Sequence, residues 1–300
     1  MNEYAIKVAP GQSSMRLDLF ILKFAQERRL GFSRVFIQQL ILEGQVKCKD
    51  QTVRKPHHKV KIGDEWILSV REKKAAEMAP EDILLEVVYE DEDLAIVNKP
   101  AGLVVHPAPG NPEHTLANAL LNRFQSLSDI NPFRPGIVHR LDKETSGLLV
   151  IAKNNCSHLD LAGQFAKHTV KRKYVAIVKG RMDFDENVIE APIGRHPFRR
   201  KNMSVSFAGS AKYAKTYYRT LKRTPEFSLL ELEPFTGRTH QLRVHLAYIK
   251  HPILGDKKYG KNDTFPRLAL HARSIGFWHP RTKRFVEWSC DIPREFLEFT

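Results

Sequence analysis

The stretch G-I-V-H-R-L-D-K-E-T-S-G-L-L-V-I-A, residues 136–152, places a charged turn between two apolar runs. Short apolar runs bounded by turn residues predict buried strands, here at 136–138 and 148–152. Asp142 lies in the turn, close to Arg140. A loop held between buried strands is a rigid position for a reactive group, so Asp142 is a candidate nucleophile or general base. The alternative is that Asp142 only caps its own turn, as aspartate commonly does.

Length and composition place the chain among ordinary globular proteins. Its 300 residues, 42% of them hydrophobic, are enough for one or two domains. No window approaches the roughly 18 apolar residues of a membrane span, and the start of the chain lacks the pattern of a secretory signal. The three cysteines form no C-x-x-C pair, which predicts neither a disulfide framework nor a zinc ribbon. We therefore expect a cytoplasmic protein with no membrane partner.

The charge balance indicates an acidic partner. Lys and Arg number 48 against 34 Asp and Glu, a net charge of +14, and nucleic acid is the first candidate for such a chain. Residues 191–225 contain no acidic residue, and their cations are interleaved with aromatics such as Phe198 and Tyr213. This mixture suits a phosphate backbone and unstacked bases. The alternative is a solvated basic face whose aromatics point inward.

The first 70 residues predict a small helix-helix-strand module. Apolar residues at i, i+3, i+4 and i+7 predict an amphipathic helix over 15–27. A second helix is expected between an N-cap at Ser33 and a left-handed C-terminal residue at Gly44. Alternating apolar and polar residues over 45–49 and 66–70 predict strands. The strand portion is rich in lysine, so its exposed edge should attract phosphate.

Four short motifs in this module resemble the ribosomal-protein-S-four-type RNA-binding domain: R-L-D-x-F at Arg16–Phe20, S-R at Ser33–Arg34, G-x-V at Gly44–Val46 and G-D at Gly63–Asp64. The resemblance covers residues 13–72. It implies RNA contacts by Arg16, Ser33, Arg34, Lys47 and Lys49. The alternative is a small α+β appendage that binds no ligand.

A polar stretch separates this module from the rest of the chain. Residues 73–84 have the composition of a linker, and the strand pattern restarts at 85, so we expect a second domain over 85–300. Helices are predicted near 116–124 and 159–165. Strands are predicted at 85–89, 94–98, 174–178, 188–193, 213–221, 227–233, 276–278 and 284–288. Neighbouring strands joined by short turns predict an α+β fold, with a mixed, mainly antiparallel sheet flanked by a few helices.

A cluster of basic residues marks the start of another predicted helix. Leu242, Leu246 and Ile249 define the buried face of a helix that begins near residue 239. Arg238, His240 and Arg243 crowd its N-terminus. Cations there oppose the helix dipole at about 0.3 to 1 kcal/mol each, which makes sense chiefly if an anion lies opposite. Asp142 or an RNA phosphate is a candidate for that anion, and a solvated first turn that tolerates the penalty is the alternative.

Other chemistries lack their motifs. His240 and His245 are five residues apart, and His245 and His251 are six apart, so neither pair has the i, i+4 spacing of a helical zinc site. The sequence contains no G-x-x-x-x-G-K-[ST], G-x-G-x-x-G or G-x-S-x-G motif. We therefore expect carboxylate chemistry on a nucleic acid, with no cofactor and no metal.

Six ordered motifs resemble the RluA family of RNA pseudouridine synthases, which change the glycosidic linkage of uridine from nitrogen to carbon. The motifs lie at Asn98–Pro107, His139–Leu148, Lys173–Ala176, Gly237–His245, His251–Asp256 and Leu270–Ala272. The resemblance runs through most of residues 85–300. It implies that Asp142 is the catalytic carboxylate, that Tyr174 lies against the target base and that Arg243 pairs with Asp142. It further implies that Arg140 enters the RNA helix where the base has left.

These implied roles are physically reasonable. A base must leave its stack before any side chain reaches its sugar, at a cost of a few kcal/mol, and a guanidinium plane in the gap with a phenol against the base offsets that cost. We group His139, Arg140, Arg238 and His240 as substrate-binding residues. Attack on the sugar, attack on the base and abstraction of a sugar proton all remain open for Asp142.

The resulting hypothesis is a monomeric RNA pseudouridine synthase that acts on large-subunit ribosomal RNA. Transfer RNA is the alternative substrate. A non-catalytic RNA-binding or ribosome-assembly protein with the same fold is the alternative of a different class, because basic patches alone would serve that role.

Overall fold

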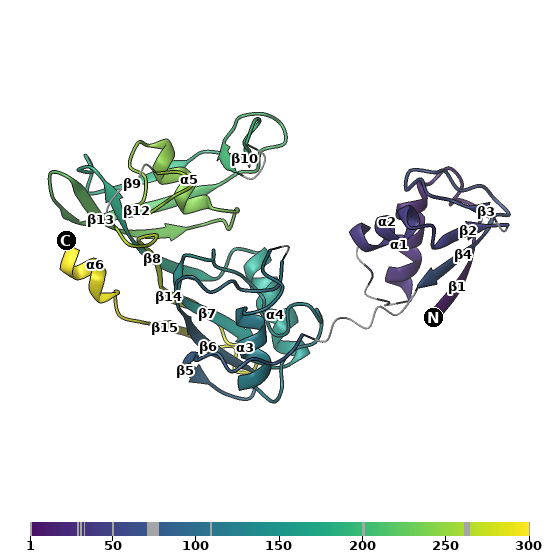
Figure 1. Cartoon of the computed structure of the whole chain (residues 1–300), viewed down its shortest axis with the longest axis horizontal. Coiled ribbons are helices and arrows are strands. Elements are labelled where there is room, and N and C mark those ends of the chain that lie inside the picture. The colour runs from purple at the N-terminus through teal and green to yellow at the C-terminus, as the bar shows by residue number, and fades with distance from the viewer. Residues whose placement is uncertain are drawn as a thin grey trace. The chain divides into compact units, whose positions relative to one another are not determined.

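The protein is described from a computed structural model that covers residues 2–28, 30, 32, 34–49, 51–70, 78–108, 110–199, 202–260 and 265–299. The chain divides into two compact units, residues 1–77 and 78–300. Figure 1 shows the elements of both units. Each unit has its own hydrophobic core. Within the described residues, every helix is too short or too polar to cross a membrane.

The N-terminal unit packs two helices on a four-stranded sheet. Its elements are β1 (Asn2–Lys7), α1 (Leu17–Glu27), α2 (Arg34–Leu42), β2 (Val46–Cys48), β3 (Gln51–Thr52) and β4 (Glu65–Val70). The strands pair in the order β1-β4-β2-β3, all antiparallel. Phe20, Ile37 and Trp66 are fully buried between helices and sheet. Strand β1 precedes the predicted start of this domain at residue 13, and its Ile6 lies opposite Trp66 in β4.

A fully buried carboxylate ties the two helices of this unit together. Asp18, in the first turn of α1, accepts hydrogen bonds from Arg16 (3.0 and 3.1 Å), Arg34 (3.0 and 3.1 Å) and Gln38 (2.7 Å). Burial alone would raise the pKa of the Asp18 carboxyl, but these hydrogen bonds outweigh it and lower that pKa to about 2. Arg16 and Asp18 of the R-L-D motif and Arg34 of the S-R motif therefore have a structural function, because they form a charge cluster around a buried carboxylate.

The C-terminal unit is built around one large mixed sheet. Its strands are β5 (Glu86–Glu90), β6 (Leu94–Lys99), β7 (Ser146–Ala152), β8 (Lys171–Lys179), β9 (Glu186–Glu190), β12 (Lys215–Arg223), β13 (Phe227–Pro234), β14 (Leu270–Trp278) and β15 (Phe285–Ser289). They pair in the order β5-β6-β7-β14-β8-β13-β12-β9, with β15 on β14. Among the described strands of this sheet, only β7 and β14 pair in parallel, which confirms the predicted mixed, mainly antiparallel sheet.

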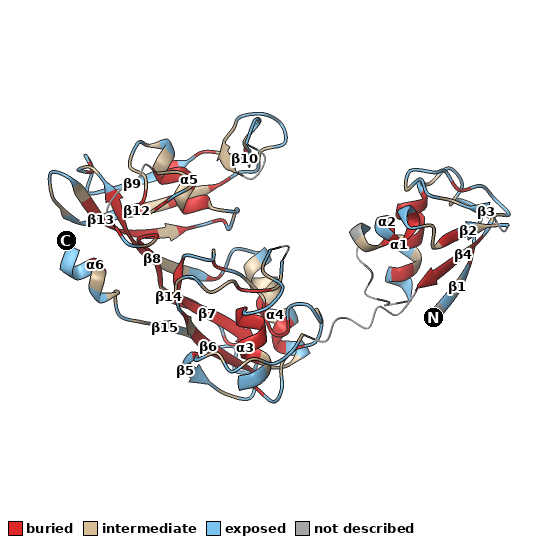
Figure 2. Cartoon of the chain, in the orientation of Figure 1, coloured by how far each residue is buried: buried red, intermediate tan, exposed pale blue. Residues whose placement is uncertain are grey.

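Helices and a small hairpin complete this unit. They are α3 (Leu116–Arg123), α4 (Asn155–Ala166), α5 (Gln241–Tyr248), α6 (Arg294–Phe299), β10 (Ile193–Arg195) and β11 (Met203–Val205). Leu116 and Leu120 of α3 pack into the main core, while Leu161 of α4 packs with Phe277 in a second core cluster. Figure 2 shows buried residues concentrated in the central strands and on the inward sides of the helices.

Strand β7 is the platform for the turn that holds Asp142. All seven residues of β7 are buried, because apolar clusters cover both of its faces. Gly147 has φ +112°, and a Cβ added there would lie 2.2 Å from the Ala272 carbonyl oxygen. Only glycine therefore allows the parallel contact between β7 and β14.

The predicted strand at 136–138 is wrong. Only Ile137 forms a bridge, to Ile151, and Gly136 turns the chain with φ +68°. The physical reason is that the left-handed turn at Gly136 interrupts the extended backbone next to Ile137, although β14 covers only the start of that side of β7. A short apolar run at such a site is buried without forming a ladder.

Residues 73–77 of the predicted linker lie outside the described residues, as do residues 71 and 72 just before it. Its later part contacts the C-terminal unit: Ala79 accepts a hydrogen bond from Asn118 at 2.9 Å, and Glu81 bonds to His114. Residues 79–81 are therefore held against α3 and its preceding loop.

Asp18→Asn is expected to destabilise the N-terminal unit by about 2 kcal/mol or more, because it leaves two guanidinium groups without their carboxylate. Hydrogen exchange of the full chain, followed by mass spectrometry, should show faster exchange in peptides of residues 2–70 and unchanged exchange in residues 78–299. Glu27→Gln, an exposed carboxylate on the same helix, is the matched control.

The same cluster predicts that the N-terminal unit loses stability in acid. The pKa of Asp18 is lower in the folded chain, at about 2, than its ordinary 3.8. Its contribution to stability is therefore complete above the ordinary pKa and is lost as pH falls toward the folded pKa. Exchange protection of residues 2–70 that is equal in wild type and Asp18→Asn at neutral pH would contradict this account.

Candidate active site

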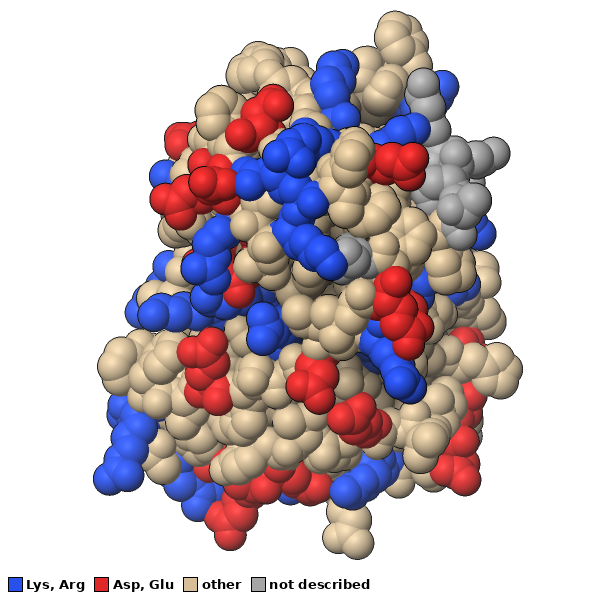
Figure 3. Space-filling view, turned by 90° about the vertical axis from the view of Figure 1, so that its left-hand side faces the viewer, with Lys and Arg blue, Asp and Glu red and all other residues tan. Residues whose placement is uncertain are grey.

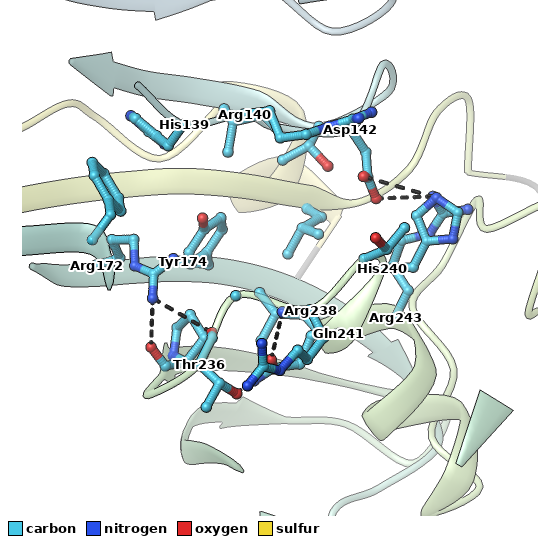
Figure 4. A pocket seen from close by; sticks show the side chains of 18 of the residues that line it. His139, Arg140, Asp142, Arg172, Tyr174, Thr236, Arg238, His240, Gln241 and Arg243 are labelled. Carbon is cyan, nitrogen blue, oxygen red and sulfur yellow. Dashed lines mark hydrogen bonds and ion pairs between the residues drawn. The ribbon is translucent and has the colours of Figure 1, made fainter. Parts of the chain in front are cut away.

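The residues predicted to carry the chemistry converge on one cavity of the C-terminal unit. A cavity of about 510 Å³ is lined by residues 138–142 and 145, by Arg172 and Tyr174 of β8, and by residues 234 and 236–243, among others (Figure 4). The first segment precedes β7, and the last ends in the first turn of α5. The cavity thus joins parts of the chain that are about 100 residues apart, since Asp142 and Arg243 are separated by 101 positions.

Asp142 points to α5 and not back to its own turn. The turn is closed by the backbone, where the Thr145 N–H donates to the Asp142 carbonyl at 3.1 Å. The Asp142 carboxylate, 20% exposed, accepts a hydrogen bond of 3.1 Å from Nη1 of Arg243. Its other oxygen lies 3.8 Å from Nε2 of His240. The arrangement favours the predicted carboxylate-cation pair over a turn cap.

Arg243 is held from behind by a second carboxylate. Its Nε and Nη2 donate to the two oxygens of Asp256, each at 2.8 Å. Asp256 is 2% exposed and also accepts the backbone N–H groups of Lys258 and Tyr259. Burial alone would lower the pKa of Arg243, but the hydrogen bonds and charge of Asp256 and the charge of Asp142 raise it well above its usual value. Arg243 is therefore a fixed cation.

A buried lysine holds the loop that carries Asp142. Lys99, at the end of β6, is fully buried, and its ammonium donates to the carbonyls of Pro100 (2.8 Å), Leu103 (2.9 Å) and Lys143 (3.0 Å). The Gly102 N–H donates to the same Lys143 carbonyl at 2.9 Å. Burial lowers the pKa of Lys99 to about 7. The K-P-A-G segment thus fixes the backbone one residue beyond Asp142.

Tyr174 lies in β8 on the cavity wall. It is 8% exposed, and Figure 4 shows its ring next to Arg172 and below the segment that bears Arg140 and Asp142. Burial and, to a smaller degree, the charge of Asp142 raise the pKa of the Tyr174 phenol, while Arg172 opposes them. Tyr174 is therefore a neutral aromatic surface within the cavity.

His139 and Arg140 differ in their settings. The His139 ring stacks on Phe165 with 4.5 Å between centroids, and its Nε2 accepts the Val150 N–H at 3.0 Å. Burial lowers the pKa of His139 to about 3, so the ring is neutral. Arg140 is exposed at the cavity. The structure thus anchors His139 in the fold and presents Arg140 to solvent.

The segment before α5 is fixed by a buried hydrogen-bond network centred on Gln241. The Gln241 side-chain oxygen accepts from Thr236 Oγ1 at 2.7 Å and from the Arg238 N–H at 3.0 Å. Its amide donates to Thr216 and to the Lys215 carbonyl, each at 3.0 Å. Arg238 also donates through Nε to the Tyr213 carbonyl at 2.9 Å. Gln241 is therefore a structural residue of the turn that presents Arg238 and His240.

His240 is not a cation, although the sequence grouped it with two basic residues. Burial outweighs the charge of Asp142 and lowers the pKa of His240 to about 4. A neutral ring at the start of α5 removes one of the three charges that would oppose the helix dipole. Arg243 and Arg238 remain as the cations of this segment.

The predicted RNA-binding residues of the N-terminal unit fall into two groups. Lys47 and Lys49 are exposed on and just after β2. Arg16 and Arg34 bind Asp18, although 44% and 47% of their side chains remain exposed. Ser33 lies outside the described residues.

The positive charge of the acid-free segment 191–225 is partly neutralised in the folded protein. Carboxylates of neighbouring strands or loops pair with its cations: Glu190 with Lys215, Glu231 with Arg219 and Asp185 with Arg223. On the face shown in Figure 3, Lys and Arg gather in the upper half with Asp and Glu beside them. Its aromatics divide as well, since Phe198 is 90% exposed and Tyr218 is 3% exposed. The segment thus has an exposed aromatic residue, as RNA contact requires, and an inward-pointing one, as the alternative expects, and RNA binding by it stays a prediction.

One group of side chains has the spacing of a cation site. Asp91, Asp93 and His279 lie within 4.8 Å of one another. His279 already bonds to Asp91 at 2.8 Å, and Arg281 pairs with Asp93. This group does not line the cavity that holds Asp142.

Comparisons with known proteins identify the family. The family model described as RNA pseudouridylate synthase matches residues 93–248, and the S4 domain model matches residues 15–65. The chain belongs to the RNA pseudouridylate synthase family. The predicted family, enzyme class and S-four-type module are thereby confirmed.

Relatives of this pseudouridine synthase cover nearly all of the chain. "Ribosomal large subunit pseudouridine synthase D" of Zymomonas mobilis is 43% identical over 88% of this chain and 87% of that protein. The protein of the same name from Escherichia coli K12 is 37% identical over 97% of this chain and 91% of its own length. A solved structure, human RNA Pseudouridylate Synthase Domain Containing 1, superimposes with a TM-score of 0.60 at 27% identity and covers 71% of this chain.

Four residues of this pseudouridine synthase have positions that sequence reasoning did not foresee: Lys99, Arg172, Asp256 and Tyr259. Lys99, Asp256 and Tyr259 lie in or just after motifs that gave no hint of their partners. Arg172 donates to the Pro234 and Thr236 carbonyls, and its Nε is buried with no hydrogen-bond partner among the described residues. In the sequence, Lys99 precedes a proline and Asp256 follows a glycine. Neither pattern predicts which residue the side chain binds.

Asp256→Asn is expected to lower kcat about 10- to 100-fold with little change in KM. Asp256 does not line the cavity, but its carboxylate holds Arg243 at the angle that reaches Asp142, and misplacement of a catalytic group is costly. The measurement is the rate of pseudouridine formation under saturating and subsaturating RNA. Glu226→Gln, an exposed carboxylate in the turn between β12 and β13, is the control. An unchanged kcat in a folded Asp256→Asn protein would show that Arg243 does not need its second carboxylate.

Proposed function

We propose that this pseudouridine synthase isomerises specific uridines of large-subunit ribosomal RNA, and that Asp142 is its catalytic carboxylate. The observation that carries the proposal is the carboxylate of Asp142 in an accessible cavity, bound to an arginine whose other donors are taken by Asp256. The names of the relatives from Zymomonas mobilis and Escherichia coli support ribosomal RNA as the substrate.

The first task of the site is to accept a base outside its stack. Extrusion of a nucleotide costs a few kcal/mol, which contacts to the flipped base and to the gap must offset. Tyr174 offers a neutral aromatic face inside the cavity, and we assign it to the target base. Arg140, exposed at the same cavity, is assigned to the gap in the RNA helix. Arg238, His240 and His139 line the remaining wall and complete the substrate-binding set.

The second task is the exchange of bonds at the sugar. The bond from C1′ to N1 breaks, the base turns, a bond from C1′ to C5 forms, and C5 loses a proton while N1 gains one. Asp142, held by Arg243, acts at the nucleoside as a base or nucleophile. All atoms of the product come from the same nucleoside, so the reaction consumes no second substrate.

The N-terminal unit is assigned to RNA binding. We propose an S-four-type domain over residues 13–72, a linker over 73–84 and a catalytic domain over 85–300. Exposed Lys47 and Lys49 are assigned to the phosphate backbone, together with the exposed parts of Arg16 and Arg34 and with Ser33. Since ribosomal RNA is the proposed substrate, we further propose that the protein acts in the cytoplasm. We also propose that it acts as a monomer.

Asp142→Asn is expected to lower the rate of pseudouridine formation at least 100-fold while RNA binding remains, because the substitution removes the reacting carboxylate but keeps the shape of the side chain. Purified wild type and variant are incubated with unmodified large-subunit ribosomal RNA, and pseudouridines are mapped by chemical labelling and primer extension. Asp183→Asn, an exposed carboxylate away from the cavity lining, is the matched control and should act like wild type.

The same assay separates the alternatives. Modification of transfer RNA and not of ribosomal RNA would replace the proposed substrate. Tight binding of either RNA by the wild type without any pseudouridine would support a non-catalytic RNA-binding protein and refute the proposed enzyme.

A further inference from the structure

The ring of His240 lies between a tyrosine and the Asp142 carboxylate. Its Nδ1 is 2.7 Å from the hydroxyl of Tyr259, and its Nε2 is 3.8 Å from Oδ1 of Asp142. His240 and Asp142 both line the cavity, and 17% and 20% of their side chains are exposed there. Both are therefore open to a substrate, whereas Tyr259 does not line the cavity.

The hydrogen bonds around Tyr259 define the tautomer of this neutral ring. The Met203 N–H donates to the Tyr259 hydroxyl oxygen at 2.9 Å, so the hydroxyl proton is free to be donated to Nδ1 of His240. A neutral imidazole has one acceptor nitrogen and one N–H. Nδ1 is then the acceptor, and the N–H is on Nε2. The opposite tautomer would direct the lone pair of Nε2 at a carboxylate, which is repulsive.

The backbone supports the same orientation at a cost. His240 is the N-cap residue of α5 and has φ 55°, in the left-handed region that residues with a side chain rarely adopt. Such a conformation costs about 1 to 3 kcal/mol and persists where surrounding contacts fix it. Here the contact to Tyr259 and the Gln241 network fix it. In this conformation Nε2 of His240 lies 3.8 Å from Oδ1 of Asp142.

The resulting pair consists of one donor and one acceptor that are too far apart for a direct hydrogen bond. Nε2–H of His240 needs an acceptor, and Oδ1 of Asp142 needs a donor, at a separation of 3.8 Å. One oxygen can lie about 2.8 Å from both atoms. To satisfy both, that oxygen must belong to a group that accepts and donates, which is a hydroxyl of the substrate or a water that such a hydroxyl displaces.

We propose that His240 and Asp142 together bind the 2′-hydroxyl of the target uridine, which accepts from Nε2 of His240 and donates to Asp142. This inference rests on the proposed function. Within an RNA chain, the 2′-hydroxyl is the only hydroxyl of a uridine, and it is on the carbon next to C1′, where the bond is exchanged. Uracil carbonyls and the ring oxygen of the sugar only accept, and uracil N3–H only donates. The site thereby distinguishes RNA from DNA at the reacting nucleotide.

Tyr259 is a positioning residue in this scheme. It acts through His240, by holding the tautomer, and its ring lies 5.2 Å from the guanidinium carbon of Arg243. Its hydroxyl also ties the site to β11 through Met203. Tyr259→Phe keeps the ring against Arg243 and removes only the hydroxyl, so it isolates the effect of the tautomer.

The test compares two RNAs that differ by one oxygen. One carries the mapped target uridine, and the other carries 2′-deoxyuridine at that position alone. Single-turnover rates and equilibrium binding are measured with the full-length wild type, His240→Asn and Tyr259→Phe. Asparagine tolerates the left-handed backbone, and its shorter side chain withdraws the donor from Asp142.

On the all-ribose RNA, His240→Asn is expected to be slower by about tenfold or more, where each tenfold is about 1.4 kcal/mol of transition-state stabilisation. On the 2′-deoxy RNA, wild type and His240→Asn should agree within about twofold, because the partner of the donor is gone. Tyr259→Phe should show a smaller loss that also disappears with the 2′-deoxy RNA. If the 2′-deoxy RNA is not converted, the same pattern is expected in the binding constants.

Equal losses on the two RNAs would overturn the proposal, since the effect of His240 would then be independent of the 2′-hydroxyl. Failure of the proposed function gives a different result. If the wild type forms no pseudouridine in the all-ribose RNA, the enzyme hypothesis fails, while the ratio of the binding constants still decides whether His240 senses the 2′-hydroxyl.

Discussion

The guanidinium of Arg243 binds two carboxylates at once, Asp256 through two hydrogen bonds of 2.8 Å and Asp142 through one of 3.1 Å. The three groups carry a net charge of one negative unit. Asp256 is buried and saturated by Arg243 and two backbone N–H groups, so the excess charge is left on Asp142, which faces the cavity. Removal of one partner from such a buried set is costly, about 3 to 5 kcal/mol in comparable cases. The fold must therefore bring both acidic segments to the same helix.

The fold meets that requirement by fixing the Asp142 turn and the first turn of α5 through separate sets of contacts. The Asp142 turn leads into β7, whose seven residues are buried, and Lys99 fixes the Lys143 carbonyl beyond it. The first turn of α5 is held by the Gln241 network. Leu141 and Leu242, one from each segment, belong to the same core cluster, and the bond of Arg243 to Asp142 joins the two segments at the cavity.

Local sequence patterns predicted those features that depend on residues close in the sequence. They did not predict interactions whose partner residue lies far along the chain. Cations at the start of a helix correctly predicted an anion opposite Arg243, but no periodicity predicts Asp256, 13 residues away. The apolar run at 136–138 forms only a single bridge, from Ile137 to Ile151, because the chain turns at Gly136. Arg16 and Arg34 were predicted as RNA contacts, and their bonds to the buried carboxylate of Asp18 could not be predicted because they follow only from helix packing. The sequence grouped His240 with the basic residues, but burial lowers its pKa and keeps the ring neutral in the folded protein.

The central claim is that Asp142 meets the sugar of an extruded uridine inside the cavity. The most direct measurement is a crystal structure of the Asp142→Asn protein bound to an unmodified RNA that contains the target uridine. We predict that the uridine has left its stack, that its C1′ lies within about 3.5 Å of the side chain at position 142, and that Tyr174 lies against its base. A target uridine that remains stacked in the RNA, or that binds outside this cavity, would contradict the account.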